Sequence, residues 1–266
     1  MIARLLLTAL TAALLAAPAR ADDDAARREL TPTGKLRVAI AVGPAPSALY
    51  AIKDGAGYRG VTIVLGSALA QKLGVPVEWV AYLATGEIQG SAASGAWDVS
   101  FMPVDAERKK FVDFGNAYHL LQSTYLVAPG SAIRTVAEAD APGVRIAGAA
   151  GTATFRASNK ASPKATHLAL AGVDAAVEAM RSGQADAIAL SRESLTGLAA
   201  KIPGSRVLDG GFLNSTTAVA VEKNKPAALA AVTAFIEDAK ASGLIRRALD
   251  SMGLKTSQVA PPGMKP

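Results

Sequence analysis

Charged side chains gather between Asp105 and Lys110, just after a short apolar stretch. That stretch, Val99 to Phe101, is typical of a buried strand that breaks at Pro103. Arg108 is the residue here best suited to binding, because its guanidinium presents a planar fork of donors that matches a carboxylate. By residue type alone, a surface arginine paired with Glu107 or Asp105 is the ordinary alternative.

A second candidate binding element is the small-residue loop from Gly148 to Ala153, which follows the predicted strand Val144 to Ala147. Backbone N–H groups at the start of a helix point at an anion, helped by the helix dipole and by hydroxyl donors. The residues that would line this anion site are Gly151, Thr152, Ala153 and Thr154. Capping of the helix by Thr152 or Thr154 is the alternative, and the two roles are compatible.

The residue types give little support to enzymatic chemistry. His119 and His167 are the only histidines, and they lie far apart without a metal-binding spacing. The chain has no cysteine, which excludes disulfides, thiol catalysis and cysteine-based metal sites. The glycines form neither a P-loop nor a dinucleotide fingerprint. We therefore expect a protein that is not an enzyme and that uses no cofactor and no metal.

The first 21 residues are typical of a secretory signal peptide. Arg4 supplies the positive charge, Leu5 to Ala17 is an uncharged and mainly apolar run, and Ala19 to Ala21 is a small-x-small cleavage site. The apolar run is too short to span a bilayer core of roughly 30 Å. We expect cleavage after Ala21 and a periplasmic protein whose polar residues from Asp22 to Pro32 form a frayed leader.

The composition argues against nucleic-acid binding. The net charge is +6, but positive residues are scattered among acids and aromatic residues make up 5% of the chain. A nucleic-acid-binding surface usually shows a basic stripe interleaved with aromatics. The chain beyond residue 21 is long enough for one large domain or two lobes.

Two segments repeat the same order of helix, glycine, aspartate and apolar strand. In the first, Gly95 and Asp98 precede the strand; in the second, Gly183 and Asp186 do. Glycine commonly closes a helix in the left-handed conformation, so the repeated order predicts two α/β lobes built alike. The other predicted strands are Lys35 to Val42, Val75 to Tyr82, Ser123 to Val127, Val207 to Leu208 and Thr217 to Val221. The other predicted helices are Gly60 to Gly74, Thr135 to Ala139 and two within 226–252 that are separated near Ser242-Gly243.

The chain is expected to cross between the lobes twice, near 127–130 and near 216–222. Such paired hinges let two lobes close over a solute. The predicted division is residues 22–128 and 217–266 for lobe 1 and 129–216 for lobe 2. We expect an aromatic turn from Phe111 to Tyr118 and a polar tail on the surface after Gly253.

The central segment resembles the motif of extracellular solute-binding proteins of family 3, the polar amino-acid receptors of ABC importers. The matching letters are Glu107-Arg108, Val112-Asp113-Phe114 and Tyr118, and the loop at Gly151 to Thr154 resembles the family's Gly-Thr/Ser-Thr loop. The resemblance covers Lys35 to about Leu254. It implies an α/β, two-lobed type II periplasmic binding protein, a monomer that hands a small carboxylate-bearing solute to an inner-membrane ABC permease.

In the family the arginine of this motif binds the α-carboxylate of the solute, and Arg108 takes that place here. The further ligand-binding residues that the resemblance implies are Gly151, Thr152, Ala153, Thr154, Ser191, Phe101, Met102, Pro103 and Ser47.

The chain also departs from the family pattern. Pro103 replaces a hydroxyl residue, the segment from Asp98 to Arg108 is two residues shorter, and Ala153 replaces a threonine. Ser191 replaces the acid that pairs with the α-amine, and Pro44 to Ser47 replace the usual aromatic residues. A buried ammonium without a carboxylate partner is costly. We therefore hypothesise that the amine anchor is lost or relocated, with Glu193 or Asp105 as substitutes.

A rival function on the same fold is a periplasmic enzyme similar to cyclohexadienyl or arogenate dehydratases. In such an enzyme an acidic residue in the cleft protonates a leaving hydroxyl. Glu193 or Asp105 is the candidate, provided that burial raises its pKa.

Overall fold

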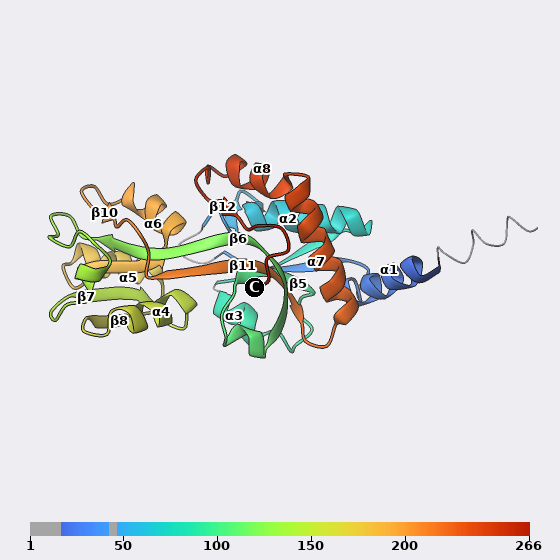
Figure 1. Cartoon of the computed structure of the whole chain (residues 1–266), viewed down its shortest axis with the longest axis horizontal. Helices are drawn as coiled ribbons and strands as arrows, with labels where there is room; N and C mark the ends of the chain where they lie inside the picture. Colours follow the sequence, from blue (N-terminus) through green and yellow to red (C-terminus); the bar gives the residue numbers. More distant parts are fainter. Residues whose placement is uncertain (1–16, 43–46, 84) are drawn as a thin grey trace, which may run out of the picture.

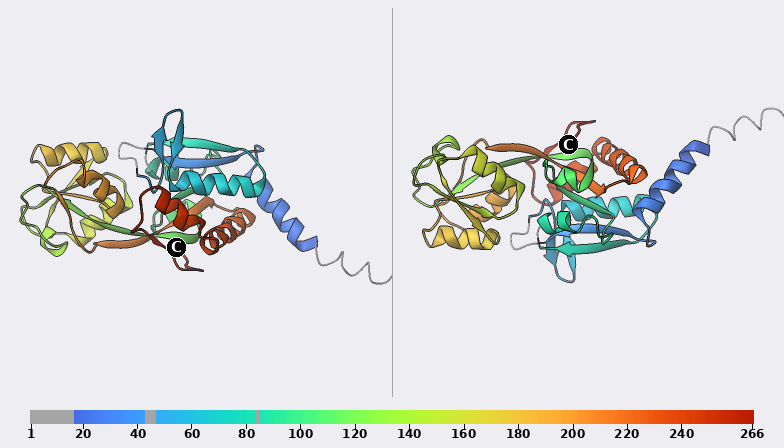
Figure 2. Two further views of the ribbon diagram at one scale, coloured as in Figure 1. Left: turned by 90° about the horizontal axis from the view of Figure 1, so that it is seen from above. Right: turned by 90° about the horizontal axis from the view of Figure 1, so that it is seen from below.

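The computed structural model describes residues 17–42, 47–83 and 85–266. Two α/β lobes lie end to end and are joined by two long strands, β6 (Val112–Val127) and β11 (Leu213–Glu222). Figure 2 shows the two strands passing between the lobes in both further views. The predicted fold, two α/β lobes with two crossings, is confirmed, whereas the exact lobe boundaries stay a prediction.

Lobe 1 is built around β1 (Leu36–Ala41), which pairs in parallel with β4 (Val77–Tyr82) and with β5 (Val99–Pro103). Strand β11 then pairs antiparallel with β5. The apolar sequence of β1 suits this central place, because a strand of a parallel sheet with helices on both faces is buried on both sides.

Lobe 2 repeats this arrangement. Its central strand β7 (Arg145–Ala149) pairs in parallel with β8 (Thr166–Leu170) and β9 (Ala187–Ser191), and β9 pairs antiparallel with β6. One continuous sheet path, β4-β1-β5-β11-β6-β9-β7-β8, therefore runs through both lobes. The remaining strands are β2 (Ile52–Asp54), β3 (Gly57–Arg59), β10 (Arg206–Val207) and β12 (Gln258–Val259).

The helices cover the faces of this sheet (Figure 1). In lobe 1 they are α2 (Val61–Leu73), α3 (Thr85–Gly90), α7 (Pro226–Ala241) and α8 (Leu244–Ser251), whereas α1 (Ala17–Leu30) projects from the end of this lobe and packs against α7. In lobe 2 they are α4 (Ala153–Ala161), α5 (Val173–Arg181) and α6 (Arg192–Ala199). Two single turns, η1 (Arg108–Lys110) and η2 (Ala137–Ala139), complete the set. The predicted break between the last two helices is present at Gly243, whose φ is 71°.

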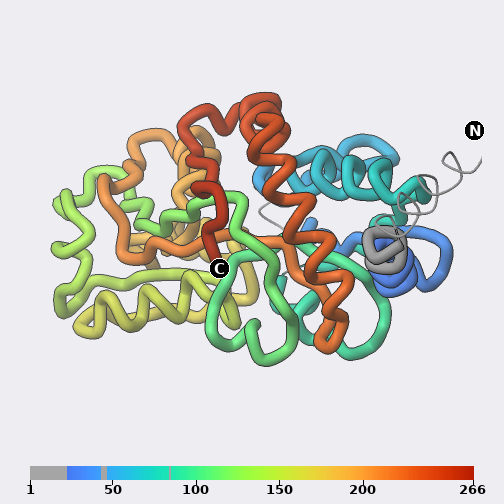
Figure 3. The backbone as a smooth tube through the Cα atoms, turned by 45° about the vertical axis from the view of Figure 1, so that its right-hand side comes forward, coloured from blue at the N-terminus to red at the C-terminus, as the bar shows by residue number. Residues whose placement is uncertain are grey.

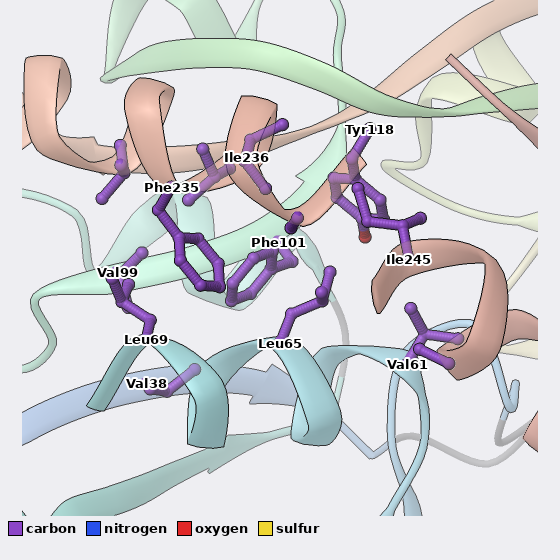
Figure 4. Close-up of a cluster of buried hydrophobic side chains, with 14 of the residues drawn as sticks. Val38, Val61, Leu65, Leu69, Val99, Phe101, Tyr118, Phe235, Ile236 and Ile245 are labelled. Atoms are coloured by element: carbon purple, nitrogen blue, oxygen red, sulfur yellow. The ribbon is translucent and has the colours of Figure 1, made fainter. Parts of the chain in front are cut away.

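The core of lobe 1 lies between α2, α7, α8 and the sheet (Figure 4). Phe101 and Tyr118 meet edge to face at its centre, with ring centroids 5.9 Å apart. Lobe 2 has its own cluster, drawn from β6, β9 and helices α5 and α6. Each lobe thus has a separate hydrophobic core, and polar groups occupy the region between the cores.

The predicted aromatic turn from Phe111 to Tyr118 is wrong. From Val112 onward these residues belong to β6, which continues for 16 residues into the second lobe. Gly115 lies inside this strand and serves close packing: a Cβ atom there would lie 2.8 Å from Val219 Cγ1 and 3.0 Å from Thr233 Oγ1. The glycine therefore lets α7 approach the strand.

Both ends of the lobe 1 sequence are more ordered than the sequence suggested. Asp22 to Pro32 was expected to fray, but α1 runs to Leu30, whose side chain is fully buried. Glu29 Oε2 accepts a hydrogen bond of 2.7 Å from Ala228 N, in the first turn of α7. Most of the predicted signal peptide lies outside the described residues.

The tail after Gly253 lies largely on the surface, as predicted, because most of its residues are exposed. It runs along the hinge strand β6 and pairs with it through β12 (Figure 3). Ser257 and Ala260 are buried. Among the residues described, none of the helices has both the length and the apolar character needed to cross a membrane.

Candidate functional site

Arg108 lies at the start of η1 and is 1% exposed. Its Nη1 donates to Pro103 O at 2.6 Å and its Nη2 donates to Thr85 Oγ1 at 2.7 Å. A guanidinium has five N–H groups, so three remain, and the Nε has no hydrogen-bond partner among the described residues. The alternative of a surface arginine is wrong. A buried cation with donors to spare can bind an anion.

Asp105 connects Arg108 to the other lobe. Its Oδ2 lies 3.6 Å from Arg108 Nε and 2.9 Å from Nη2 of Arg156, a residue of α4. Its Oδ1 accepts hydrogen bonds from the backbone N of Glu107 and of Arg108. Burial lowers the pKa of Arg108, the Asp105 carboxylate opposes that shift, and Arg156 adds to it. Asp105 is therefore held between two guanidinium groups.

The loop before α4 is built as a helix cap. Thr152 is the N-cap of α4, and its Oγ1 accepts a hydrogen bond of 3.2 Å from Phe155 N. Gly151 has a φ of 72°, and its carbonyl accepts from Arg156 Nη1 at 2.9 Å. Ala153 opens the helix, and Thr154 Oγ1 lies 3.3 Å from Ser123 Oγ. Capping is thus present, and the anion-binding role of this loop stays a prediction.

Three predicted ligand contacts lie on β5, and two of them point into cores. Phe101 is 2% exposed in the lobe 1 core, and Met102 is fully buried in a second apolar cluster. Their side chains thus pack in apolar clusters, and contact of these residues with a solute stays a prediction. Pro103 pairs with Thr217 of β11, and its carbonyl is already an acceptor for Arg108.

A cavity of about 570 Å³ opens between the lobes. Its lining includes Ser47 from the loop after β1, Glu193 from α6, and Ser257 from the C-terminal tail. Ser191 does not line this cavity; it caps α6 by accepting from Ser194 N at 3.3 Å. The first four residues of the loop replacing the family's aromatics, residues 43–46, lie outside the described part of the chain.

At this cavity Glu193 contacts the hinge strand β6 and the C-terminal tail. Its Oε1 lies 3.4 Å from His119 Nε2, on the hinge strand β6, and accepts from Ser257 Oγ at 3.2 Å. Burial alone would raise the pKa of Glu193, but the His119 imidazole and the Ser257 hydroxyl outweigh it, so the pKa is lowered. The raised pKa that a general acid at this position needs is therefore absent, and Glu193 is an anion at neutral pH.

Tyr50 is a site residue that the sequence reasoning missed. It follows the loop after β1, and its backbone N donates to Ser47 O at 2.9 Å. Burial raises the pKa of its phenol, the Arg108 charge opposes this, and the Glu193 charge reinforces it. The phenol therefore lies within electrostatic reach of both groups. Its signal in the sequence was its place as the first aromatic after the first strand.

The chemistry available here is binding of a small solute. Within residues 17–42, 47–83 and 85–266, no three histidine, cysteine or acidic side chains are grouped as a metal site would require. Lobes joined by two strands, with a cavity between them that polar and apolar side chains line together, define the class of two-lobed receptors that enclose a small solute. The family model of bacterial extracellular solute-binding proteins, family 3, matches residues 36–253, and the chain belongs to this family.

Comparison with known proteins places the chain among receptors of this kind. It is 28% identical over 145 residues to an ABC transporter glutamine-binding protein of Bacillus subtilis, a match that covers 54% of this chain and 53% of the relative. The chain thus spans about half the length of this curated relative.

Solved structures give a longer match. An ancestral amino acid-binding protein, AncCDT-1, described as a precursor of cyclohexadienyl dehydratase, is 29% identical with a TM-score of 0.73, covering 85% of this chain and 98% of that chain. An arginine-bound ABC transporter substrate-binding protein of Streptococcus pneumoniae is 22% identical with a TM-score of 0.73, covering 84% and 96% of the two chains. At 22% identity the likeness concerns the fold alone.

Proposed function

We propose that this protein is the periplasmic receptor of an ABC importer and that it captures a small carboxylate-bearing solute, an amino acid or a related organic acid. The observation that carries the proposal is the buried Arg108 guanidinium with N–H groups that the protein's own acceptors do not use. Its place beside the interlobe contact of Asp105 and Arg156 supports a solute held as the lobes close. The glutamine-binding relative supports the same class of solute.

We further propose that the protein is exported to the periplasm and that it delivers the solute to a permease. Cleavage after Ala21 would leave Ala26, Glu29 and Leu30 in place, so the contacts of α1 with lobe 1 survive in the mature protein. The receptor acts as a monomer and hands its solute to an inner-membrane permease.

A thermal-shift screen with Arg108→Lys tests the proposed anchor. The mature protein is heated with the L-amino acids and with small carboxylic acids, and the variant is treated alike. A ligand at a hundredfold excess over its dissociation constant stabilises the fold by about 2.7 kcal/mol. We expect at least one carboxylate to stabilise the wild type and to lose most of that effect in the variant, since lysine lacks the planar fork.

Lys109→Ala is the matched control, because Lys109 is an exposed neighbour in the same turn. A carboxylate effect that survives Arg108→Lys would move the anchor elsewhere. Absence of any effect in the wild type would contradict the receptor.

The second candidate is a dehydratase-like enzyme, favoured by the similarity to AncCDT-1. The lowered pKa of Glu193 speaks against it, because an ionised carboxylate cannot protonate a leaving hydroxyl at neutral pH. Turnover of prephenate or arogenate by the purified wild type would favour the enzyme, and saturable binding without turnover favours the receptor.

A further inference from the structure

The C-terminal tail, residues 254–266, is fastened to lobe 1 along its length. At its start, Arg246 of α8 donates from Nη1 to Ser257 O at 2.6 Å and from Nη2 to Leu254 O at 2.9 Å. The tail then pairs with the hinge strand β6 through β12. Directly after β12, the backbone N of Ala260 donates to Tyr118 O at 3.0 Å. This part of the tail is therefore held by both α8 and β6.

The second half of the tail is fastened to α7. Lys240 Nζ donates to Pro261 O at 3.0 Å, and Glu237 Oε2 accepts a hydrogen bond of 2.9 Å from Gly263 N. Both side chains belong to the helix that also covers the sheet of lobe 1. The tail therefore moves with lobe 1 when the two lobes move relative to each other.

Ser257 of the tail also contacts the other lobe. Its Oγ donates to Glu193 Oε1, in the first turn of α6, at 3.2 Å, and the residue is 7% exposed. His119 Nε2, on the lobe 1 part of β6, lies 3.4 Å from the same oxygen. Since Glu193 is ionised at neutral pH, the hydrogen bond is charge-assisted, and such bonds are among the stronger ones in proteins. The tail thus adds a breakable contact between the lobes to the two covalent hinge strands.

This contact lies in the wall between two cavities. The interlobe cavity of about 570 Å³ and a second cavity of about 450 Å³ beside the hinge strands are both lined by Arg192, Glu193, Thr256 and Ser257. The tail and the start of α6 therefore separate the two spaces where they touch. Because one side of this wall belongs to each lobe, separation of the lobes has to break it.

We propose that the C-terminal tail is a latch, in which the hydrogen bond from Ser257 to Glu193 favours the closed arrangement of the lobes. The many contacts of the tail with lobe 1 keep it in place, so opening breaks its contact with Glu193 and leaves the tail on lobe 1. Loss of a hydrogen bond to a charged group shifts a two-state balance by about tenfold or more. The latch acts without a solute, so this inference goes beyond the proposed function and does not depend on it.

The test measures the distance between the lobes in solute-free protein. Because the chain contains no cysteine, spin labels attach only where cysteines are introduced. Gln71→Cys on α2 and Glu178→Cys on α5 place one label on an exposed position of each lobe. Pulsed electron spin resonance of the labelled protein, dialysed to remove bound solute, gives the distribution of distances. With Ser257→Ala added, the ratio of long to short distances should rise about tenfold.

Ser251→Ala is the matched control, because this exposed serine of α8 donates to Ala248 O within its own helix. The control should leave the distribution unchanged. Glu193→Ala removes the acceptor from the other lobe and should also widen the distribution. The double variant with Ser257→Ala should be no wider than Glu193→Ala alone, because the two changes remove the same contact.

The outcomes separate this inference from the proposed function. An unchanged distribution in Ser257→Ala overturns the latch, and so does a double variant whose effect is the sum of the two single effects. If Ser257→Ala does not fold, an unchanged distribution in Glu193→Ala overturns the latch in its place. None of these results bears on the receptor, because no solute is present. Failure of carboxylates to bind the wild type would overturn the receptor and leave the latch standing or falling by the measured distances.

Discussion

Asp98 and Asp186 hold the first strand of each lobe in the same way. Asp98 accepts from the backbone N, Nε and Nη2 of Arg37, at 2.8, 3.1 and 2.7 Å. Asp186 accepts from the same three atoms of Arg145, at 2.8, 2.9 and 2.7 Å. The repeated aspartate in the sequence therefore marks a clamp between neighbouring strands, present once in each lobe.

The two clamps differ in burial, so removal of each aspartate should lower the free energy of unfolding by a different amount. The Asp98 side chain is fully buried, whereas that of Asp186 is 34% exposed. Asp98→Ala leaves the mostly buried guanidinium of Arg37 without its carboxylate partner and should lower the free energy of unfolding by about 3–5 kcal/mol. Asp186→Ala should cost clearly less, since solvent screens the exposed pair. Urea unfolding of both variants checks this order, and equal losses would contradict it.

At the scale of elements, the C-terminal tail is tied to the rest of lobe 1 by Glu237 of α7. This carboxylate accepts from Asn116 Nδ2 on β6, from Lys240 Nζ, and from Gly263 N in the tail. Burial alone would raise its pKa, but these donors, led by Lys240, together outweigh burial and lower the pKa to about 2 from the ordinary 4.5. The ionised form therefore stabilises the folded protein.

The pH dependence of stability follows from this lowered pKa. The stabilisation by Glu237 is complete above pH 4.5 and is lost as the pH falls towards about 2, because the unfolded chain takes up the proton first. Glu237→Gln should be less stable than the wild type at neutral pH and should approach it at the acid end. Thermal unfolding across this range measures the difference, with Glu178→Gln as the control. A constant gap between the curves would be the contrary result.

The sequence predicts elements well where they are local and less well where distant contacts shape them. The periodicity of α2 and the glycine before α8 are readable in a short window, and both are confirmed. The sequence predicts an aromatic turn and a separate strand where the structure has the single strand β6, in which Gly115 lets α7 approach from more than a hundred positions away in the sequence. The path of the tail along β6 depends on similar long-range pairing.

The residues of the candidate site also divide into those that a local motif indicates and those that distant contacts bring together. The sequence indicates Arg108, because the residues of its motif are contiguous. Tyr50 and the partners of Glu193 were not found, because His119 and Ser257 come to Glu193 from distant parts of the chain. No motif or spacing in the sequence indicates that these residues lie in contact.

At the scale of the whole molecule, Arg156 and Asp105 form an ion pair from one lobe to the other, 2.9 Å long. The Arg156 side chain is 40% exposed and that of Asp105 is 18% exposed. A pair of this exposure contributes up to about 1 kcal/mol. That is enough to bias the balance between open and closed arrangements without fixing it.

Removal of this pair should therefore favour opening. Arg156→Gln keeps a polar side chain, which is shorter, and removes the charge. The radius of gyration of this variant without solute should exceed that of the wild type in small-angle X-ray scattering. Raising the salt concentration should enlarge the wild type in the same direction, because salt screens exposed charges. Lys160→Gln, an exposed position on the same helix, serves as the control. An identical radius for wild type and Arg156→Gln would refute a role in closure.

The composition of the two cores has a consequence for the order in which a newly made chain can fold. The main cluster of lobe 2 draws on residues between Leu126 and Ile202, a single contiguous stretch. The core of lobe 1 joins Leu30 to Leu249, so it stays incomplete until nearly the whole polypeptide has emerged. A chain that emerges N-terminus first therefore exposes the apolar strands of lobe 1 at a stage when every residue of the main lobe 2 cluster is already present. The core of lobe 1 is complete only after α7 and α8 have emerged.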